Sequence, residues 1–88
     1  MNAQRRKALK AVITKLEDLE SLRQEIKEEL EDIMDEEQES FDNMPEGLQE
    51  SDRGQQMQEY ISTMEGVFDD LSDMDIDGMA DQLREIVE

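Results

Sequence analysis

The sequence predicts an all-α protein: an antiparallel hairpin of two helices that form a coiled coil. Two observations support this fold class. Apolar residues recur at alternating intervals of three and four along both halves of the chain, which is the heptad pattern of a coiled coil. Between the halves lie Pro45 and Gly47, and both residue types interrupt helices. With 88 residues, the chain is expected to form a single helical domain, residues 1–88.

The first helix is predicted over about residues 3–39. Its heptad positions a and d hold, in order, Leu9, Val12, Leu16, Leu19, Arg23, Ile26, Leu30 and Ile33. Arg23 is the polar exception, and we expect it either to set the register or to reach an acid such as Glu20 or Glu65. Further apolar residues widen the stripe, as in a helix of a bundle rather than a two-stranded zipper.

A hinge is predicted over about residues 40–51, followed by a second helix over about 52–74. Asp52 and Gln55 have the spacing of a capping box, with Asp52 as the N-cap. The apolar rhythm falters near Gly78, so we expect the second helix to bend or break there. A continuation or a short third helix is expected over about 77–87.

Folding the chain back at the hinge pairs residues whose numbers add to about 90, such as Leu30 with Tyr60 and Leu19 with Leu71. The same register brings the basic N-terminus, Arg5, Arg6 and Lys10, near the acids Asp81 and Glu85. One hairpin leaves much of the apolar stripe uncovered. The expected assembly is therefore a homodimer that forms a four-helix bundle.

The charge of the chain is strongly asymmetric. Its net charge is −17, yet residues 1–27 carry seven Lys and Arg against four acids, and residues 28–88 carry two against 22. Such a distribution favours a protein partner with a basic surface and argues against direct binding of nucleic acid.

Several residue types needed for chemistry are missing. The absence of His and Cys removes the commonest catalytic base, the thiol nucleophile and the imidazole metal ligand, so we expect no enzymatic activity. No apolar run is long enough for a signal peptide or a membrane span, and we expect a cytoplasmic protein.

Acids in the second half of the first helix are the leading candidate site. The partner-binding candidates are Glu28, Glu29, Asp32, Asp35, Glu36 and Glu39. Acids on neighbouring helices approach the charge spacing of duplex DNA, so this surface is expected to act as a DNA mimic that blocks a basic protein surface. The alternative is a structural or assembly coiled coil whose acids only keep it in solution.

A second candidate is a weak calcium loop formed by Asp73, Asp75, Asp77 and Asp81. Residues 73–78 read D-x-D-x-D-G, which matches the start of an EF-hand loop. The bidentate Glu of that loop is replaced by Arg84. The alternative interpretation is a helix start at Gly78 capped by Asp77. No other cofactor is expected.

The hinge also carries a resemblance to known proteins. Its matching residues are Glu36-Glu37-Gln38-Glu39, Asp42-Asn43-Met44-Pro45-Glu46-Gly47-Leu48-Gln49 and Ser51-Asp52-Arg53. With a heptad helix on either side, this resembles small acidic coiled-coil proteins of tailed bacteriophages. The resemblance implies a phage setting, in which an acidic inhibitor of host defence proteins is a reasonable role. The aspartate-rich break at residues 73–78 departs from that pattern.

Overall fold

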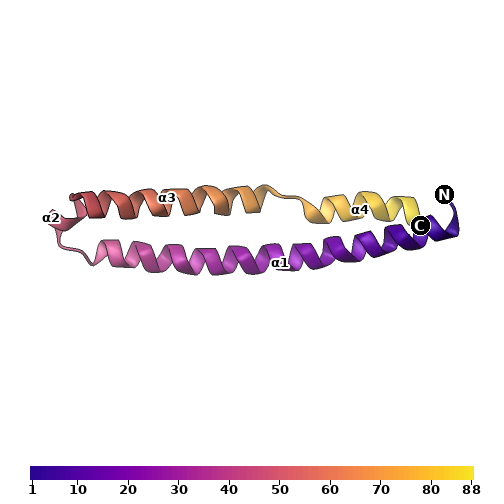
Figure 1. Ribbon diagram of the computed structural model, residues 1–88, viewed down its shortest axis with the longest axis horizontal. Coiled ribbons are helices and arrows are strands. Elements are labelled where there is room, and N and C mark those ends of the chain that lie inside the picture. Colours follow the sequence, from indigo (N-terminus) through magenta and orange to yellow (C-terminus); the bar gives the residue numbers. More distant parts are fainter. The chain divides into compact units, whose positions relative to one another are not determined.

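The computed structural model describes all residues, Met1–Glu88, and consists of helices alone. The helices are α1 (Ala3–Asp42), α2 (Glu46–Gln49), α3 (Asp52–Asp73) and α4 (Ile76–Val87) (Figure 1). They cover 89% of the chain and no strand is present, which confirms the all-α class. The chain divides into two compact units, one formed by residues 1–25 with 74–88 and one formed by residues 26–73.

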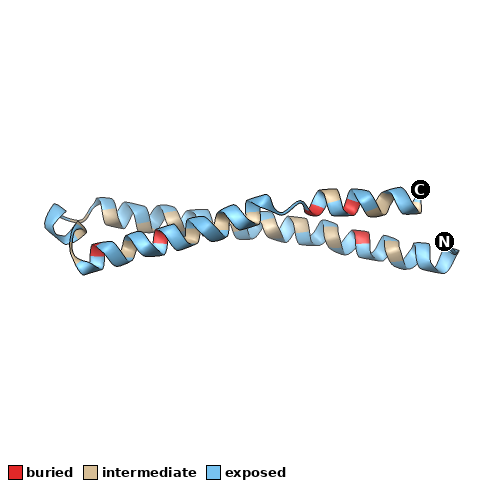
Figure 2. Ribbon diagram, turned by 90° about the horizontal axis from the view of Figure 1, so that it is seen from above, coloured by how far each residue is buried: buried red, intermediate tan, exposed pale blue.

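In the first unit, the N-terminal part of α1 lies beside α4 (Figure 1). The small core of this unit is formed by Ile13 of α1 and by Ile76 and Ala80 of α4, which are all buried (Figure 2). Ile76 is the most enclosed large side chain, with 1% of its surface exposed. One ion pair joins the two helices, from Arg84 to Glu17, at 2.9 Å.

In the second unit, the C-terminal part of α1 lies beside α3, and the short α2 connects them (Figure 1). The ammonium of Lys27 lies 5.0 Å from the ring centroid of Phe68, a cation–π contact between α1 and α3. The side-chain amide of Gln49 donates a hydrogen bond of 2.9 Å to the carbonyl of Phe41. This bond holds α2 against the end of α1. Gly54 and Ile61 of α3 are buried.

The helix boundaries differ from the expected ones mainly at the turn. α1 continues three residues beyond Glu39, to Asp42, and residues of the expected hinge form α2. Pro45 immediately precedes α2, where its fixed φ and missing N–H suit a helix start. The next break falls at residues 74–75, so α4 begins at Ile76 rather than at residue 77.

Both predicted N-caps are wrong by one or two residues. α3 is capped by Ser51, because the N–H of Gly54 donates to the Ser51 hydroxyl at 3.4 Å. That hydroxyl also donates to the carbonyl of Leu48, so Ser51 links the end of α2 to the start of α3. α4 is capped by Asp75, whose carboxylate accepts from the N–H of Gly78 at 2.9 Å. Asp77 lies inside the first turn of α4.

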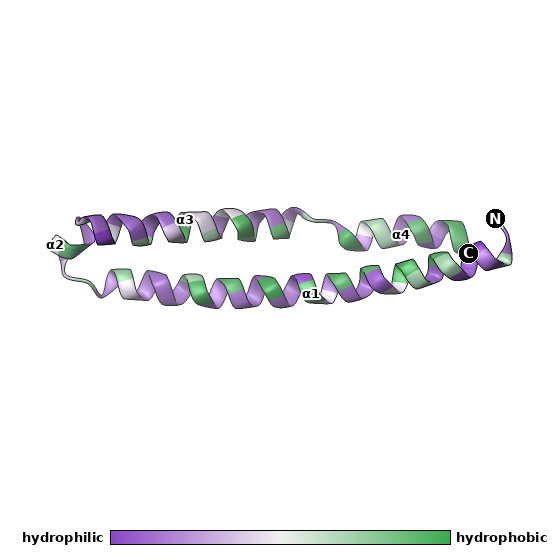
Figure 3. Ribbon diagram, viewed as in Figure 1, coloured by the Kyte–Doolittle hydropathy of each residue, from purple (hydrophilic) through white to green (hydrophobic).

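The seam of α1 is also rotated from the expected one. Counting heptads from Leu9 as position a, the partly or fully covered residues occupy positions a and e: Leu9, Ile13, Leu16, Glu20, Arg23, Lys27, Leu30, Met34, Glu37 and Phe41. Position a is as expected, whereas the residues at position d are exposed. Hydrophobic and hydrophilic residues are interspersed along α1, α3 and α4 (Figure 3).

The register differs from the expected one as well. The numbers of Lys27 and Phe68 add to 95, and those of Glu17 and Arg84 add to 101, rather than to 90. In the second unit the reason is the position of the turn, which lies midway between Asp42 and Asp52 and therefore beyond Pro45. In the first unit, α4 is a separate helix that begins at its own cap. The register of α3 therefore does not determine how α4 is aligned with α1.

Candidate functional site

The six predicted acids form one outward surface of α1, which we call the acidic face: Glu28, Glu29, Asp32, Asp35, Glu36 and Glu39. All six are exposed. They occupy heptad positions c, f and g, on the side of α1 opposite to the covered positions a and e. None of them takes part in an ion pair, because the ion pairs of the chain involve only Arg23 and Arg84. The structure therefore presents six uncompensated carboxylates together.

A second surface consists of apolar side chains that the chain itself does not cover. The apolar row of α1 is Val12, Leu19, Ile26 and Ile33, at heptad position d. Their exposed fractions are 45%, 44%, 41% and 52%. Rows with the same seven-residue spacing are exposed on α3, at Tyr60 and Val67, and on α4, at Met79 and Ile86. Regular apolar rows of this kind are typical of helix faces that pack on a partner.

The basic N-terminal residues are not paired with the acids of α4. Arg5, Arg6 and Lys10 are exposed and form no ion pair. Asp81 instead forms an ion pair with Arg84, which lies three residues further along α4. No ion pair therefore joins these basic residues to the acids of α4.

The four aspartates of the predicted calcium loop are not gathered into a ligand set. Asp73 is the last residue of α3, Asp75 is the N-cap of α4, and Asp77 lies in the first turn of α4. Asp81 lies on the next turn and is paired with Arg84. No group of three or more acids in the chain is arranged to hold a metal ion.

Arg23 lies in the covered seam and is bound by a neighbour on its own helix. Its Nε and Nη2 donate to the two carboxylate oxygens of Glu20 at 2.9 and 2.6 Å. This hydrogen bonding, together with the negative charges of Glu20, Asp77 and Asp75, raises the pKa of Arg23 above its usual value. The arrangement satisfies a charge on an otherwise apolar seam. Of the two acids considered for Arg23, the structure selects Glu20.

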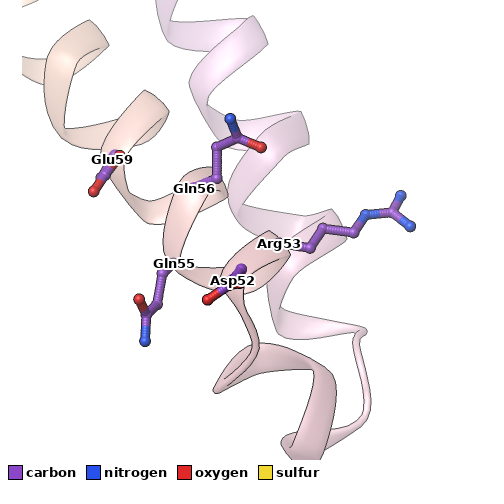
Figure 4. A pocket seen from close by; sticks show the side chains of 5 residues that line it. All are labelled: Asp52, Arg53, Gln55, Gln56 and Glu59. Carbon is purple, nitrogen blue, oxygen red and sulfur yellow. The ribbon is translucent and has the colours of Figure 1, made fainter.

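A shallow surface hollow of about 370 Å³ lies at the start of α3. It is lined by Asp52, Arg53, Gln55, Gln56 and Glu59. Figure 4 shows that these side chains project outward from consecutive turns and do not converge on a common point. Converging polar groups are what a small-molecule site requires, and this hollow lacks them.

Two contacts escape sequence reasoning entirely. They are the ion pair of Glu17 with Arg84 and the cation–π contact of Lys27 with Phe68. Glu17 lies at heptad position b, outside the apolar stripe, and Lys27 occupies a covered position e. No local sequence signal identifies either pair, because both depend on the register between helices far apart in the chain.

Comparisons with known proteins give no assignment. No protein-family model matches this chain, and no curated protein and no solved structure is significantly similar to it. None of the four helices combines the length and the apolar character that a bilayer span requires.

Proposed function

We propose that this protein binds a protein partner with a basic surface through the acidic face of α1. The observation that carries the proposal is the set of six exposed carboxylates on one side of one helix, none of which is in an ion pair within the chain. Exposed carboxylates held at fixed positions on a helix attract a basic partner over several ångströms and orient it. The net charge of −17 strengthens that attraction.

The spacing of these charges supports a finer form of the proposal, mimicry of nucleic acid. The acidic face extends over eleven residue steps, or about 17 Å of helix axis. Duplex DNA carries roughly ten phosphate charges over the same length. Six carboxylates on α1, with the exposed acids of α3 in the same unit, approach that density. The target would then be the DNA-binding groove of a nucleic-acid-handling or defence protein, which agrees with the resemblance to phage proteins.

The test is capture from bacterial lysate by immobilised protein, with mass spectrometry of the captured proteins and release by salt. The test variant carries Glu28→Gln, Asp32→Asn, Asp35→Asn and Glu39→Gln. A matched control carries Asp18→Asn, Glu25→Gln, Glu85→Gln and Glu88→Gln, four exposed acids outside the acidic face and outside α3, with the same change in net charge. Circular dichroism verifies that both variants keep their helicity.

The proposal expects a basic protein that the control captures and the test variant does not. Duplex DNA should displace that protein if the acidic face mimics nucleic acid. Equal capture by the wild-type protein and by the test variant would overturn the proposal. If capture depends on the acidic face but DNA does not compete with it, the proposal of a basic partner would stand. The proposal of DNA mimicry would be rejected.

The exposed apolar rows favour a second candidate function, a structural or assembly protein that forms a homodimeric four-helix bundle. Each row would join a common core with its counterpart in the second copy. Sedimentation equilibrium measures this directly. Leu19→Asp should leave a monomer, whereas Thr14→Asp, at an outward position of the same helix, should not change the mass. A monomeric wild-type protein at about 100 μM would exclude this candidate for the isolated chain.

A further inference from the structure

We infer that the apolar row of α1 binds a second copy of this chain, with the two α1 helices antiparallel and in one defined register. In that register, residues whose numbers add to 42 share a core layer. The inference rests on the dimer proposed above and adds its orientation, its register and the residues that select them. Its experiments separate failure of the dimer from failure of the register.

The heptad positions a and d of α1 differ in their exposure. Position a is partly covered by the chain itself, whereas position d is exposed along the whole row from Val12 to Ile33. In a four-helix bundle, positions a and d of each helix both face the central axis. The hairpin therefore completes only half of the bundle core. A second set of helices over position d would complete the other half.

The apolar core positions of α1 also match one another when the helix is reversed. Antiparallel coiled coils place each position a beside a position d of the partner. With a sum of 42, Leu9 faces the partner subunit's Ile33, and Leu16 faces the partner subunit's Ile26. Leu30 likewise faces the partner subunit's Val12. The remaining layer sets Leu19 beside the partner subunit's Arg23, whose guanidinium is held by Glu20. Six of the eight core positions from Leu9 to Ile33 therefore form apolar layers, over about 36 Å of helix.

The two halves of α1 differ in charge. On α1, residues 3–21 hold five Lys and Arg against three acids, and residues 22–42 hold two against ten. An antiparallel pair sets the basic half of each helix beside the acidic half of the other. A parallel pair would set the two acidic halves together, which is strongly unfavourable. The asymmetry of charge along α1 therefore selects the antiparallel orientation.

The flanking positions of this pair are complementary as well. In antiparallel bundles, residues at position g of neighbouring helices approach one another beside the core, as charged e and g residues do in coiled coils generally. The register places Lys15 beside the partner subunit's Glu29 and Leu22 beside the partner subunit's Leu22. Lys15 and Glu29 are both exposed and have no ion pair within the chain. The two-fold axis makes this pair occur twice in each dimer.

The other helices extend the same face within each unit. Within each unit, two antiparallel helices pack through equivalent heptad positions. An approximate two-fold axis normal to the plane of the two helices therefore relates them. Because of this symmetry, the same heptad position on both helices points to the same side of the pair. Tyr60 and Val67 of α3 and Met79 and Ile86 of α4 occupy the positions that correspond to the apolar row of α1. Each unit thus offers an apolar face that is two helices wide. A hairpin of the same kind fits such a face, and a lone partner helix would leave part of it uncovered.

Sedimentation equilibrium with charge-reversal variants tests the register. Lys15→Glu and Glu29→Lys should each weaken the dimer about tenfold, because each introduces two like-charge contacts. The double variant Lys15→Glu/Glu29→Lys should return to the wild-type dissociation constant. Lys7→Glu, at an outward position f, is the matched control and should change it less than twofold. Single-variant weakening without recovery in the double variant would overturn the register.

Distances between spin labels test the orientation independently. The chain has no cysteine, so a single introduced thiol is labelled uniquely. Residue 21 lies level with the two-fold axis along the helix, and residue 7 lies at the same heptad position two heptads earlier; the labelled variants are Ser21→Cys and Lys7→Cys. The antiparallel dimer predicts a label separation along the axis near zero for residue 21 and about 42 Å for residue 7. Equal distances for both labels would show a parallel pair and overturn the inference. A monomeric mass would instead remove the dimer on which it rests.

Discussion

The Nη2 atom of Arg84 lies 2.9 Å from Oε1 of Glu17, so one ion pair joins the last helix to the first across 67 residues of chain. Arg84 also donates to Asp81 of its own helix. The two side chains of the long-range pair are 39% and 54% exposed, so water screens their attraction. We expect the pair to select the alignment of α4 on α1 more than to stabilise it.

Replacement of Arg84 by Gln should therefore lower the melting temperature by no more than about 3 °C. The hydrogen bonds that Arg84 donates to Glu17 and Asp81 raise the pKa of Arg84 above its usual value. A raised pKa means that the contribution is complete below the usual arginine range and is lost only as the pH rises through the folded-state pKa. The difference in melting temperature between the wild-type protein and the variant should therefore be the same at pH 7 and pH 10. A difference that disappears by pH 10 would contradict this assignment.

Gly54 is required at the start of α3 because the backbone of Gln49 lies directly against it. A Cβ on Gly54 would stand 2.6 Å from the carbonyl carbon of Gln49, and a backbone atom cannot move aside as a side chain can. We expect Gly54→Ala to destabilise the protein by about 1–3 kcal/mol, measured by urea denaturation. It should also increase the hydrogen exchange of α2 before that of α4, because α2 lies directly against this turn.

Gly66 provides the matched control. It lies in the middle of the same helix, and a Cβ there would have no heavy atom within 4 Å. Gly66→Ala should therefore stabilise the protein by about 0.5–1 kcal/mol, because alanine loses less backbone entropy in a helix. If both substitutions shifted the urea midpoint in the same direction, the close approach of α2 to α3 would be in question.

Local sequence signals account for the helical class and for the positions of both interruptions. The heptad rhythm marks the helical segments, and Pro45 marks the turn, because both signals act through neighbouring residues only. The interruption before α4 is also marked locally, because Asp75 lies three residues before the backbone N–H of Gly78 that it caps. The sequence does not identify which aspartate is the cap, because three aspartates in alternate positions offer the same pattern.

The rotation of the seam and the register could not be read in this way. Ile13 and Val12 are adjacent apolar residues, and the choice of which faces the neighbouring helix depends on the twist and offset of that helix. The offset depends in turn on α2, a single turn held by Gln49 and Ser51 through contacts that no periodicity predicts. The six residues of the acidic face are exposed, because their charges exclude them from any seam.

Asp75 is the N-cap of α4 and therefore fixes the position of Ile76, the buried first residue of that helix. Its carboxylate accepts from the N–H of Gly78, and a Cβ at Gly78 would collide with that carboxylate. Asp75→Ala should cost about 1 kcal/mol of stability and fray the first turn of α4, where Ile76 lies. Asp75→Asn should be nearly neutral because Asn caps as well as Asp does. Thermal denaturation followed by circular dichroism distinguishes them, and equal losses in both variants would indicate a role for the charge rather than for the cap.

Calcium should leave the stability of this protein unchanged. The carboxylate of Asp75 is engaged with the backbone of Gly78, and Asp81 is paired with Arg84, which also occupies the place of the bidentate ligand in a calcium loop. A calcium ion would therefore have to displace a helix cap and approach a guanidinium. We expect the melting temperature in 1 mM calcium to equal that in 1 mM magnesium at the same ionic strength, which controls for general screening of the acids. A rise specific to calcium that is abolished by Asp77→Asn would show that these aspartates rearrange into a binding loop, at the cost of the first turn of α4.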